Sequence, residues 1–325
     1  MKRRAFVTAA ALLALAGRAG AQGRVPKIGY FIFTSLSEPP SLERQAFLDA
    51  LRALGYVPGK NIEIVYASAQ GEAVFLDEVC QDLIQRKVDL IVVSGGVAVL
   101  AAKRNTRTIP IVMQAVGDPV GTGVVRSLAH PEGNITGVSF LSSELAGKRM
   151  QLIREVLPAA RRVAVLWDPR NSNASVEAKT SLEAAKQLGM RAEPFPVNAD
   201  AQLPATLDRI HSSGAQALYV TFEGGLVAGN RTYIAESALK HRIPTVSGWS
   251  FFTEAGGLMS YAPSIPEMFR RSASYVDRIL KGAKPSELPI EQATKVELVL
   301  NMRTARALKA RIPQSVLLRA DRVIE

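Results

Sequence analysis

Side chains able to bind a small molecule follow a series of short apolar runs in this chain, at the positions where those runs end. Hydroxyl groups and helix N-termini are donors suited to a carboxylate, acidic side chains suit an amine, and aromatic faces suit a flat apolar body. The candidates before residue 150 are Phe33, Thr34, Ser35, Ser94, Gly95, Gly96, Asp118 and Ser139. Those after it are Trp167, Asp168, Asn171, Asn173, Phe222, Glu223, Ser247, Trp249 and Tyr261. Together they predict a site for a small carboxylate with a planar or branched apolar body, and Asp118 and Glu223 suit an amine if the ligand carries one.

Patterns that would indicate catalysis are largely missing from the sequence. The three histidines, His130, His211 and His241, are isolated, and no two of them have the spacing of metal ligands. There is no Gly-x-Ser-x-Gly elbow and no phosphate-binding Gly-Lys-Ser/Thr motif. Gly121-Thr122-Gly123 lacks the third glycine of a dinucleotide fingerprint. We therefore expect a binding cleft without a reaction, with no catalytic residue, no metal and no cofactor.

The stretch from Val88 to Phe140 contains the elements that would position the first group of candidates. Asp89–Val93 is an apolar, β-branched run that suits a strand buried on both faces, and Ser94-Gly95-Gly96 ends it before a helix of small residues. Ile111–Val116 is a second such run, stopped by Gly117-Asp118, and a third strand delivers Ser139. Open α/β sheets bind ligands outside the carboxyl ends of their parallel strands, so these loops should share one edge of a sheet.

The strand–helix pattern restarts with the apolar run Arg162–Trp167. Leu54-Gly55-Tyr56, before the second strand, is matched by Leu188-Gly189-Met190, before the sixth. Two successive series of similar length predict two similar Rossmann-like α/β domains with parallel sheets. A cleft between them would offer strand ends and helix N-termini from both sides.

Several candidates also have a simpler structural interpretation. Trp167 and Phe33 could complete the core packing of their strands. Asp118 and Asp168 precede prolines and could form turns. Asn171 or Ser172 could cap the following helix.

Charge and composition are those of a globular protein. The chain has 325 residues, 47% of them hydrophobic and 21% charged, with a formal net charge of +11. Four of the positive charges lie in residues 1–21, and the remainder form no basic run. A nucleic-acid-binding surface would cluster them, so we expect no nucleic-acid partner.

The first 21 residues read as a secretory signal. Lys2-Arg3-Arg4 is followed by an apolar segment, Phe6–Ala16, too short to span a bilayer, and by Ala19-Gly20-Ala21, a small-x-small cleavage site. We expect cleavage after Ala21 and a soluble, periplasmic product; the paired arginines leave the Sec and twin-arginine routes both open. Cys80, the only cysteine, is far from this site and lies on an apolar stripe, so we expect a buried, inert thiol.

Longer segments carry a resemblance to a known family. They are Leu54–Ile62, Asp118–Gly121, Asn134–Ser139, Gly256–Tyr261 and the C-terminal run from Ile279 to Glu325. In their order and spacing they resemble the solute-binding component of an ABC importer, of the tryptophan/aromatic-type subgroup with the type I periplasmic-binding-protein fold. The resemblance covers nearly the whole chain after residue 26.

This resemblance implies two domains joined by three crossings of the chain. The implied N-terminal domain comprises residues 24–140 and 264–290, and the C-terminal domain residues 141–263 and 291–325. We place the crossings near Phe140–Ser143, Tyr261–Ser264 and Pro289–Thr294.

The resemblance also implies a function. The protein would be a monomer that captures a small molecule, such as an aromatic or branched amino acid or an aromatic carboxylate, and delivers it to the permease subunits of an ABC transporter. Amino-acid-binding members resemble one another in an Asn-Asp segment where this chain has Thr221–Gly225, and there Glu223 could hold an ammonium group. The alternatives are an exported α/β enzyme acting on a small polar solute and, disfavoured by the leader, the effector domain of a repressor.

Overall fold

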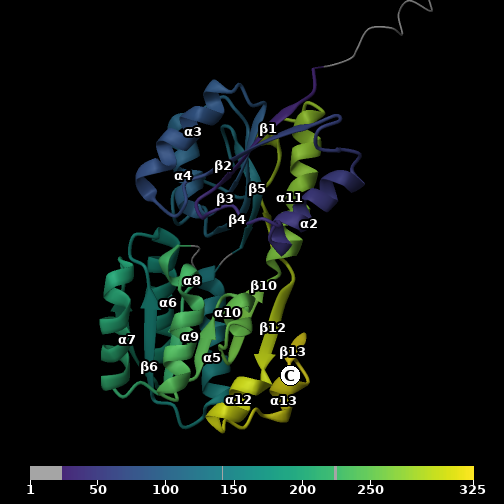
Figure 1. The fold of residues 1–325 in the computed structure, drawn as a ribbon. Coiled ribbons are helices and arrows are strands. Elements are labelled where there is room, and N and C mark those ends of the chain that lie inside the picture. Colours follow the sequence, from purple (N-terminus) through teal and green to yellow (C-terminus); the bar gives the residue numbers. More distant parts are fainter. Residues whose placement is uncertain (1–23, 141, 223–224) are drawn as a thin grey trace, which may run out of the picture.

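Two lobes, one above the other, make up the protein in a computed structural model that describes residues 24–140, 142–222 and 225–325 (Figure 1). The predicted signal peptide and its cleavage site after Ala21 lie outside the described residues, as does Glu223. Each lobe is built around one predominantly parallel sheet covered by helices, so the prediction of two Rossmann-like α/β domains is confirmed.

The first lobe contains a six-stranded sheet in the order β11-β5-β4-β3-β1-β2, in which every described pair is parallel. Its strands are β1 (Lys27–Ile32), β2 (Glu63–Ser68), β3 (Leu90–Ser94), β4 (Ile111–Gly117), β5 (Ile135–Phe140) and β11 (Glu291–Gln292). Its helices are α2 (Leu42–Ala53), α3 (Leu76–Gln85), α4 (Gly96–Asn105) and α11 (Ile265–Leu280), with short 3-10 turns at Ala73–Phe75 and Pro285–Glu287.

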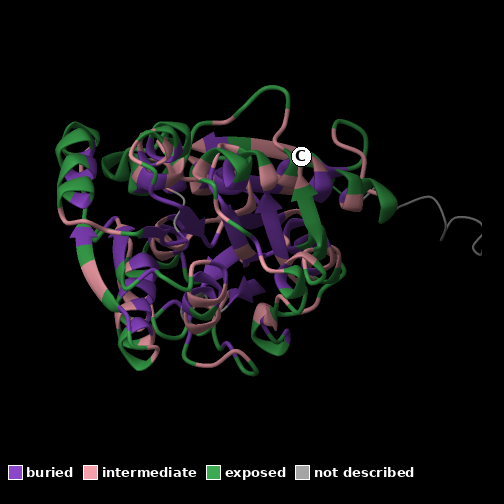
Figure 2. Cartoon of the chain, turned by 90° about the horizontal axis from the view of Figure 1, so that it is seen from below, coloured by how far each residue is buried: buried purple, intermediate pink, exposed green. Residues whose placement is uncertain are grey.

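Helices cover both faces of this sheet, which is why its central strands are continuous apolar runs. Every residue of β4 and β5 is buried. Figure 2 shows buried strands at the centre of the molecule, with the exposed residues mainly on the surrounding helices and loops. Helices α2 and α11 pack on one face and α3 and α4 on the other. Cys80 of α3 is fully buried, and burial raises the pKa of its thiol to about 11, which fits the predicted inert thiol.

Gly137 of β5 fixes a close approach between two strands. Its φ is +134°, and a Cβ added there would lie 2.1 Å from the carbonyl oxygen of Met113 on β4. The register between β4 and β5 shifts immediately after Met113. Only glycine therefore lets β5 lie against β4 while Ser139 and Phe140 reach the end of the sheet.

The second lobe contains a seven-stranded sheet in the order β13-β12-β10-β9-β8-β6-β7. Its strands are β6 (Arg162–Trp167), β7 (Arg191–Pro196), β8 (Ala217–Val220), β9 (Thr245–Ser247), β10 (Met259–Pro263), β12 (Val296–Asn301) and β13 (Arg322–Ile324), and only the β10–β12 pair among these is antiparallel. Its helices are α5 (Ser142–Val156), α6 (Ser172–Gln187), α7 (Leu203–Ser212), α8 (Leu226–Gly229), α9 (Arg231–Lys240), α10 (Ser250–Glu254), α12 (Met302–Leu308) and α13 (Gln314–Leu317), with a 3-10 turn at Asp200–Gln202.

The chain passes between the two sheets at three places. These are between β5 and α5, at Ser264 between β10 and α11, and between β11 and β12. The third passage follows Ala293, within the range Pro289–Thr294 implied by the resemblance and just beyond the implied domain boundary at residue 290. Glu291 and Gln292 pair with β5 of the first sheet, and the backbone N–H of Ala293 still donates to the Ser139 carbonyl at 2.8 Å. This backbone pairing keeps the chain on the first sheet until after Ala293.

Candidate ligand-binding site

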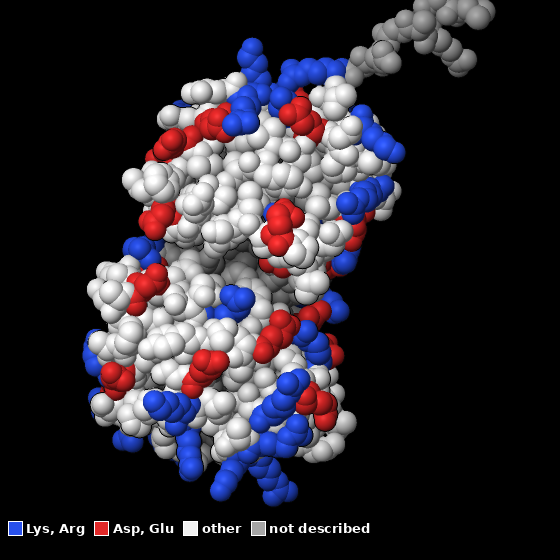
Figure 3. Space-filling model, viewed as in Figure 1, with Lys and Arg blue, Asp and Glu red and all other residues white. Residues whose placement is uncertain are grey.

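The carboxyl ends of the two sheets face each other across the junction of the lobes. Asn173, at the start of α6, lies against Gly96 and Gly117 of the first lobe, and the ring of Phe140 at the end of β5 contacts that of Phe222 after β8. Figure 3 shows the surface hollowed between the lobes. The structure therefore brings residues of both predicted groups, among them Gly96 and Asn173, to opposite walls of the cleft between the lobes.

The first wall is made mainly of backbone and small residues. Gly95 caps α4 with a φ of +92° and no side-chain hydrogen bond, and α4 begins at Gly96. A Cβ added to Gly96 would lie 2.5 Å from Asn173 Nδ2, and one added to Gly117 would lie 3.6 Å from Asn173 Cγ. The absence of side chains at these two glycines lets the opposite wall approach.

Asp118 is held within its own turn. Its backbone has a φ of +44°, its Oδ1 accepts the Gly121 N–H at 2.9 Å, and its carbonyl accepts the Thr122 hydroxyl at 2.8 Å. These bonds are those of a turn-forming aspartate, the structural alternative given above. The half-buried carboxylate nevertheless stays at the edge of the sheet that faces the cleft.

The remaining residues of the first wall divide by exposure. Phe33 packs into the core beside α3 and α4, and Thr34 and Ser35 are exposed in the loop after β1. Ser94 is half-buried at the end of β3. Ser139 is fully buried, and its hydroxyl has no hydrogen-bond partner among the described residues.

The loop after β6 uses most of its polar groups locally. Asp168 is 4% exposed, and its carboxylate oxygens accept hydrogen bonds from Nε and Nη2 of Arg170 at N···O distances of 2.6 to 3.1 Å. Asn171 caps α6 by accepting the N–H groups of Asn173 and Ala174. Trp167 packs partly into the core of the second lobe. Asn173 differs, since its side chain reaches the first wall and its Oδ1 has no hydrogen-bond partner among the described residues.

An aromatic cluster of Phe222 and Trp249, with Phe140 from the first lobe, lies in the second wall where β8 and β9 end. The Trp249 ring stacks on Phe222 with centroids 3.7 Å apart and planes 4° apart, and Phe140 of the first lobe meets Phe222 edge-on at 4.1 Å. Trp249 Nε1 is buried with no hydrogen-bond partner among the described residues, and the Ser247 hydroxyl accepts the Trp249 N–H at 3.2 Å. Tyr261 lies half-buried in β10, near the second passage. The cluster joins both lobes and offers flat apolar faces.

A buried ion pair behind this wall was not predicted from the sequence. Arg149 of α5 and Glu177 of α6 have side chains with 0% exposure, and Arg149 Nη1 lies 2.9 Å from Glu177 Oε1. The Tyr219 hydroxyl donates to Glu177 Oε1 and accepts from Arg149 Nη1 at 3.1 Å. A signal did exist: Arg149 falls on the apolar stripe of Ala146, Met150 and Ile153, and a charge in such a stripe needs a buried partner.

The Arg149 guanidinium keeps its charge despite complete burial. Burial alone would lower the pKa of Arg149. Tyr219 and Glu177 together raise it by more than burial lowers it, so the guanidinium pKa lies above its usual value. Burial raises the pKa of the Tyr219 hydroxyl well above its usual value, which keeps the hydroxyl protonated as a donor to Glu177. Arg149 therefore stays charged at neutral pH.

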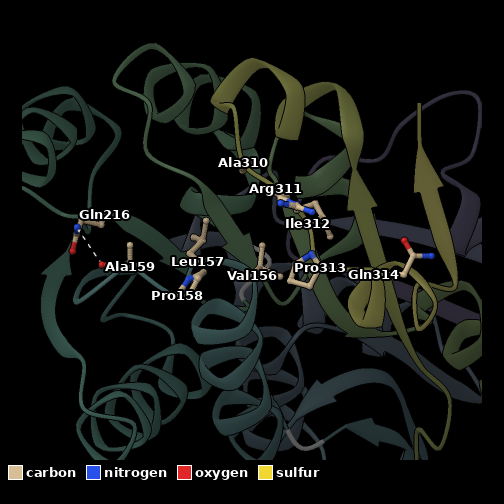
Figure 4. A pocket seen from close by; sticks show the side chains of 11 residues that line it. Val156, Leu157, Pro158, Ala159, Gln216, Ala310, Arg311, Ile312, Pro313 and Gln314 are labelled. Carbon is tan, nitrogen blue, oxygen red and sulfur yellow. Dashed lines mark hydrogen bonds between the residues drawn. The ribbon is translucent and has the colours of Figure 1, made fainter.

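A separate cavity lies at the far end of the second lobe, away from the cleft. Its volume is about 750 Å³, and residues 156–160, residues 310–314 and Gln216 line it (Figure 4). Its lining is mainly apolar, with Arg311 as the one ionisable side chain among these residues. It draws no residue from either wall and contains none of the predicted site residues.

The described part of the chain contains neither a candidate metal cluster nor a candidate membrane span. Within residues 24–140, 142–222 and 225–325, no group of three or more His, Cys, Asp or Glu side chains could hold a metal ion. In the same part of the chain, no helix is long and apolar enough to cross a membrane.

Comparisons with known proteins agree with this architecture. Residues 33–324 match the model of the ABC transporter substrate binding protein family. A tyrosine-binding protein of Clostridioides difficile is 24% identical over 278 residues, 85% of this chain and 79% of the relative.

Solved structures resemble the chain closely. A Streptococcus pneumonia ABC domain in complex with L-Trp is 25% identical, with a TM-score of 0.87 over 93% of this chain and 100% of that one. A conserved domain protein of Vibrio cholerae is 28% identical, also with a TM-score of 0.87, over 92% of this chain and 100% of that one.

Proposed function

The chain belongs to the ABC transporter substrate binding protein family, and we propose that its interdomain cleft binds an aromatic amino acid, with L-tryptophan and L-tyrosine as the first candidates. Members of this family are extracytoplasmic proteins that bind small molecules and work with ABC permeases, and such proteins are not typically enzymes. The named relatives, one tyrosine-binding and one in complex with L-Trp, support this choice of ligand.

The observation that carries the proposal is the aromatic cluster at the junction of the lobes. Phe222 and Trp249 stack with nearly parallel planes, and Phe140 adds an edge from the other lobe. A planar ligand would find matching faces and edges here, because aromatic groups pair favourably in stacked and edge-to-face arrangements. Sugar recognition would instead require many polar side chains at this place.

Polar groups near the cluster suit the two charged ends of an amino acid. The N-terminus of α4 and the buried Ser139 hydroxyl are donors on the first wall for a carboxylate. Asp118, together with Asn173 Oδ1 on the second wall, can accept from an ammonium group. Glu223 lies outside the described residues and is proposed as a further ammonium partner on the basis of its type and position alone.

We further propose that the ligand stabilises the closed arrangement of the lobes. Asn173 contacts Gly96 and Gly117 only when the walls are together, and a ligand touching both walls favours that state by its differential affinity. Small-angle scattering should show a smaller radius of gyration with L-tryptophan than without it. An unchanged radius at saturation would argue against hinge closure.

A thermal-shift panel tests the ligand class directly. At a hundredfold excess over the dissociation constant, a ligand specific for the folded state stabilises it by about 2.7 kcal/mol. L-tryptophan and L-tyrosine should raise the melting temperature, while sugars and nucleosides should leave it unchanged. Native mass spectrometry of protein purified without refolding gives an independent answer through any co-purified ligand.

Delivery to a permease and periplasmic location complete the proposal. They follow from family membership and from the leader-like residues 1–21, with cleavage expected after Ala21. N-terminal sequencing of the periplasmic fraction should give a product that begins at Gln22, and an uncleaved chain retained in the membrane would contradict this.

A further inference from the structure

Besides their ion pair, Arg149 and Glu177 each make a hydrogen bond to the backbone of the second wall. Glu177 Oε1 accepts the backbone N–H of Phe222 at 3.1 Å, which fixes the chain just after β8. Arg149 Nε donates to the carbonyl oxygen of Tyr261 at 2.7 Å, which fixes β10 close to the second passage. Two separate segments of the wall are thus anchored by one pair of side chains.

The guanidinium also determines the position of a third segment. A Cβ added to Gly248 would lie 3.0 Å from both Cζ and Nη2 of Arg149, so the chain before Trp249 runs directly over the guanidinium. Phe222 and Trp249, whose rings stack on each other, are therefore both supported from behind by the same ion pair.

Stability alone does not account for such a pair. Removing two charges from water costs about as much as their attraction returns, and apolar side chains of similar volume often stabilise a core equally well. What apolar side chains cannot do is bond to the Phe222 N–H and the Tyr261 carbonyl. These directed bonds are the property that the ion pair adds.

We infer that Arg149 and Glu177 are positioning residues for the ligand site, which hold Phe222, Trp249 and Tyr261 in the arrangement that the ligand meets. The inference rests on the proposed function, since it assigns these three residues to the site. Neither side chain needs to touch the ligand, because both are fully buried behind the wall.

The central variant replaces the pair by apolar residues, Arg149→Met with Glu177→Leu. Calorimetric titration with L-tryptophan should show binding weakened about tenfold or more, while the ligand-free protein stays folded. The single variant Glu177→Gln keeps an oxygen that can accept the Phe222 N–H. It should therefore bind almost as tightly as the wild type, and more tightly than the double variant, even though its melting temperature is lower than that of the wild type. Ser181→Ala is the matched control: it removes a buried hydroxyl one turn further along α6, bonded only to the Glu177 carbonyl among the described residues, and should bind as the wild type does.

Hydrogen exchange of the ligand-free proteins supplies a readout that requires no ligand. Peptides that contain Phe222 and Trp249 should exchange faster in the double variant than in the wild type, and peptides from β6 and β7 should not. If wild-type protein binds neither L-tryptophan nor L-tyrosine, the proposed ligand is wrong, while this exchange pattern still tests the positioning role.

The outcomes separate clearly. Weaker binding by the double variant, recovery in Glu177→Gln and faster exchange around Phe222 and Trp249 would support the inference. Affinity within about twofold of wild type, or unchanged exchange in those peptides, would overturn it. If the double variant does not fold, Arg149→Lys serves instead: lysine keeps the charge but lacks the rigid fork through which Nη1 bonds to Glu177 and Nε to the Tyr261 carbonyl, so binding should weaken, and unchanged binding would overturn the inference.

Discussion

The two walls of the cleft are built differently. The first wall presents Gly95, Gly96 and the turn of Asp118, so its surface is largely backbone. The second presents Asn173, Phe222 and Trp249, whose larger side chains extend toward the first lobe.

For the proposed ligand site, we infer a division of roles from this difference. The backbone wall gives close approach and helix N–H groups, which suit a carboxylate common to many ligands. The side-chain wall supplies shape and aromatic faces, which discriminate between ligands. A change in the first wall should therefore affect closure, and a change in the second should affect which ligand binds.

The largest effect is expected from the side-chain wall. Trp249→Ala removes the ring that stacks on Phe222, and we expect L-tryptophan affinity to fall about tenfold or more, since truncation of a buried aromatic contact often costs 2 kcal/mol or above (a rough figure). Trp249→Phe keeps a flat ring and should bind more tightly than Trp249→Ala. Calorimetric titration measures both, and equal affinity of Trp249→Ala and wild type would remove this wall from ligand recognition.

A smaller loss should follow from the backbone wall. Gly96→Ala adds a methyl group 2.5 Å from Asn173 Nδ2, so the lobes should close less completely and affinity should fall severalfold. Gly147→Ala, in helix α5 with no heavy atom within 4 Å of the added Cβ, is the matched control. Gly147→Ala should stabilise the helix by up to about 1 kcal/mol and leave the closure of the lobes unchanged.

The same contact can be tested by rescue. In the double variant Gly96→Ala with Asn173→Ala the obstruction is removed, so the radius of gyration with ligand should return toward the wild-type value. If Gly96→Ala alone closes fully, the two walls do not meet at these residues as described.

The smallest effect is expected far from both walls. The Arg319 guanidinium, by bonding to Glu155, lowers the pKa of that carboxyl, and Ser315 adds a weaker contribution. A lowered folded-state pKa stabilises the protein above the unfolded-state pKa, and this gain is lost as the pH falls through the folded-state value. Arg319→Met should therefore cost less than about 1 kcal/mol at pH 7, because the pair is partly exposed, and less at pH 3 than at pH 7.

Chemical denaturation at the two pH values measures this difference, and Arg319→Met should bind L-tryptophan as the wild type does. A loss of affinity in this variant would show that ligand binding also depends on residues far from both walls.

Much of the fold could be read from the sequence because its strands carry strong local patterns. The strand predicted at Asp89–Val93 is β3 (Leu90–Ser94), and Asn171 caps α6, one of the roles that the sequence suggested for it. Both features depend on residues close together in the chain. The pairing of Glu291 and Gln292 with β5 has no such local signal, because it is set by backbone bonds over about 150 residues of separation.

The site was predicted as a set of residues but not as an arrangement. Strand-end position identified Phe222, Trp249 and Asn173, yet their contacts with each other and with the first lobe depend on how the lobes meet. Arg149 was overlooked because a charged residue in an amphipathic helix is usually assigned to its exposed face. Its partner Glu177 lies on another helix, so no local pattern joins them.

Calorimetric titration of the wild-type protein with L-tryptophan, L-tyrosine and galactose tests the central claim most directly. We predict saturable binding of at least one of the two amino acids, at about one ligand per chain, and no heat of binding with galactose. The heat capacity change should be negative, since the aromatic body becomes buried between the walls. Binding of galactose without binding of either amino acid would contradict the claim that this cleft recognises an aromatic amino acid.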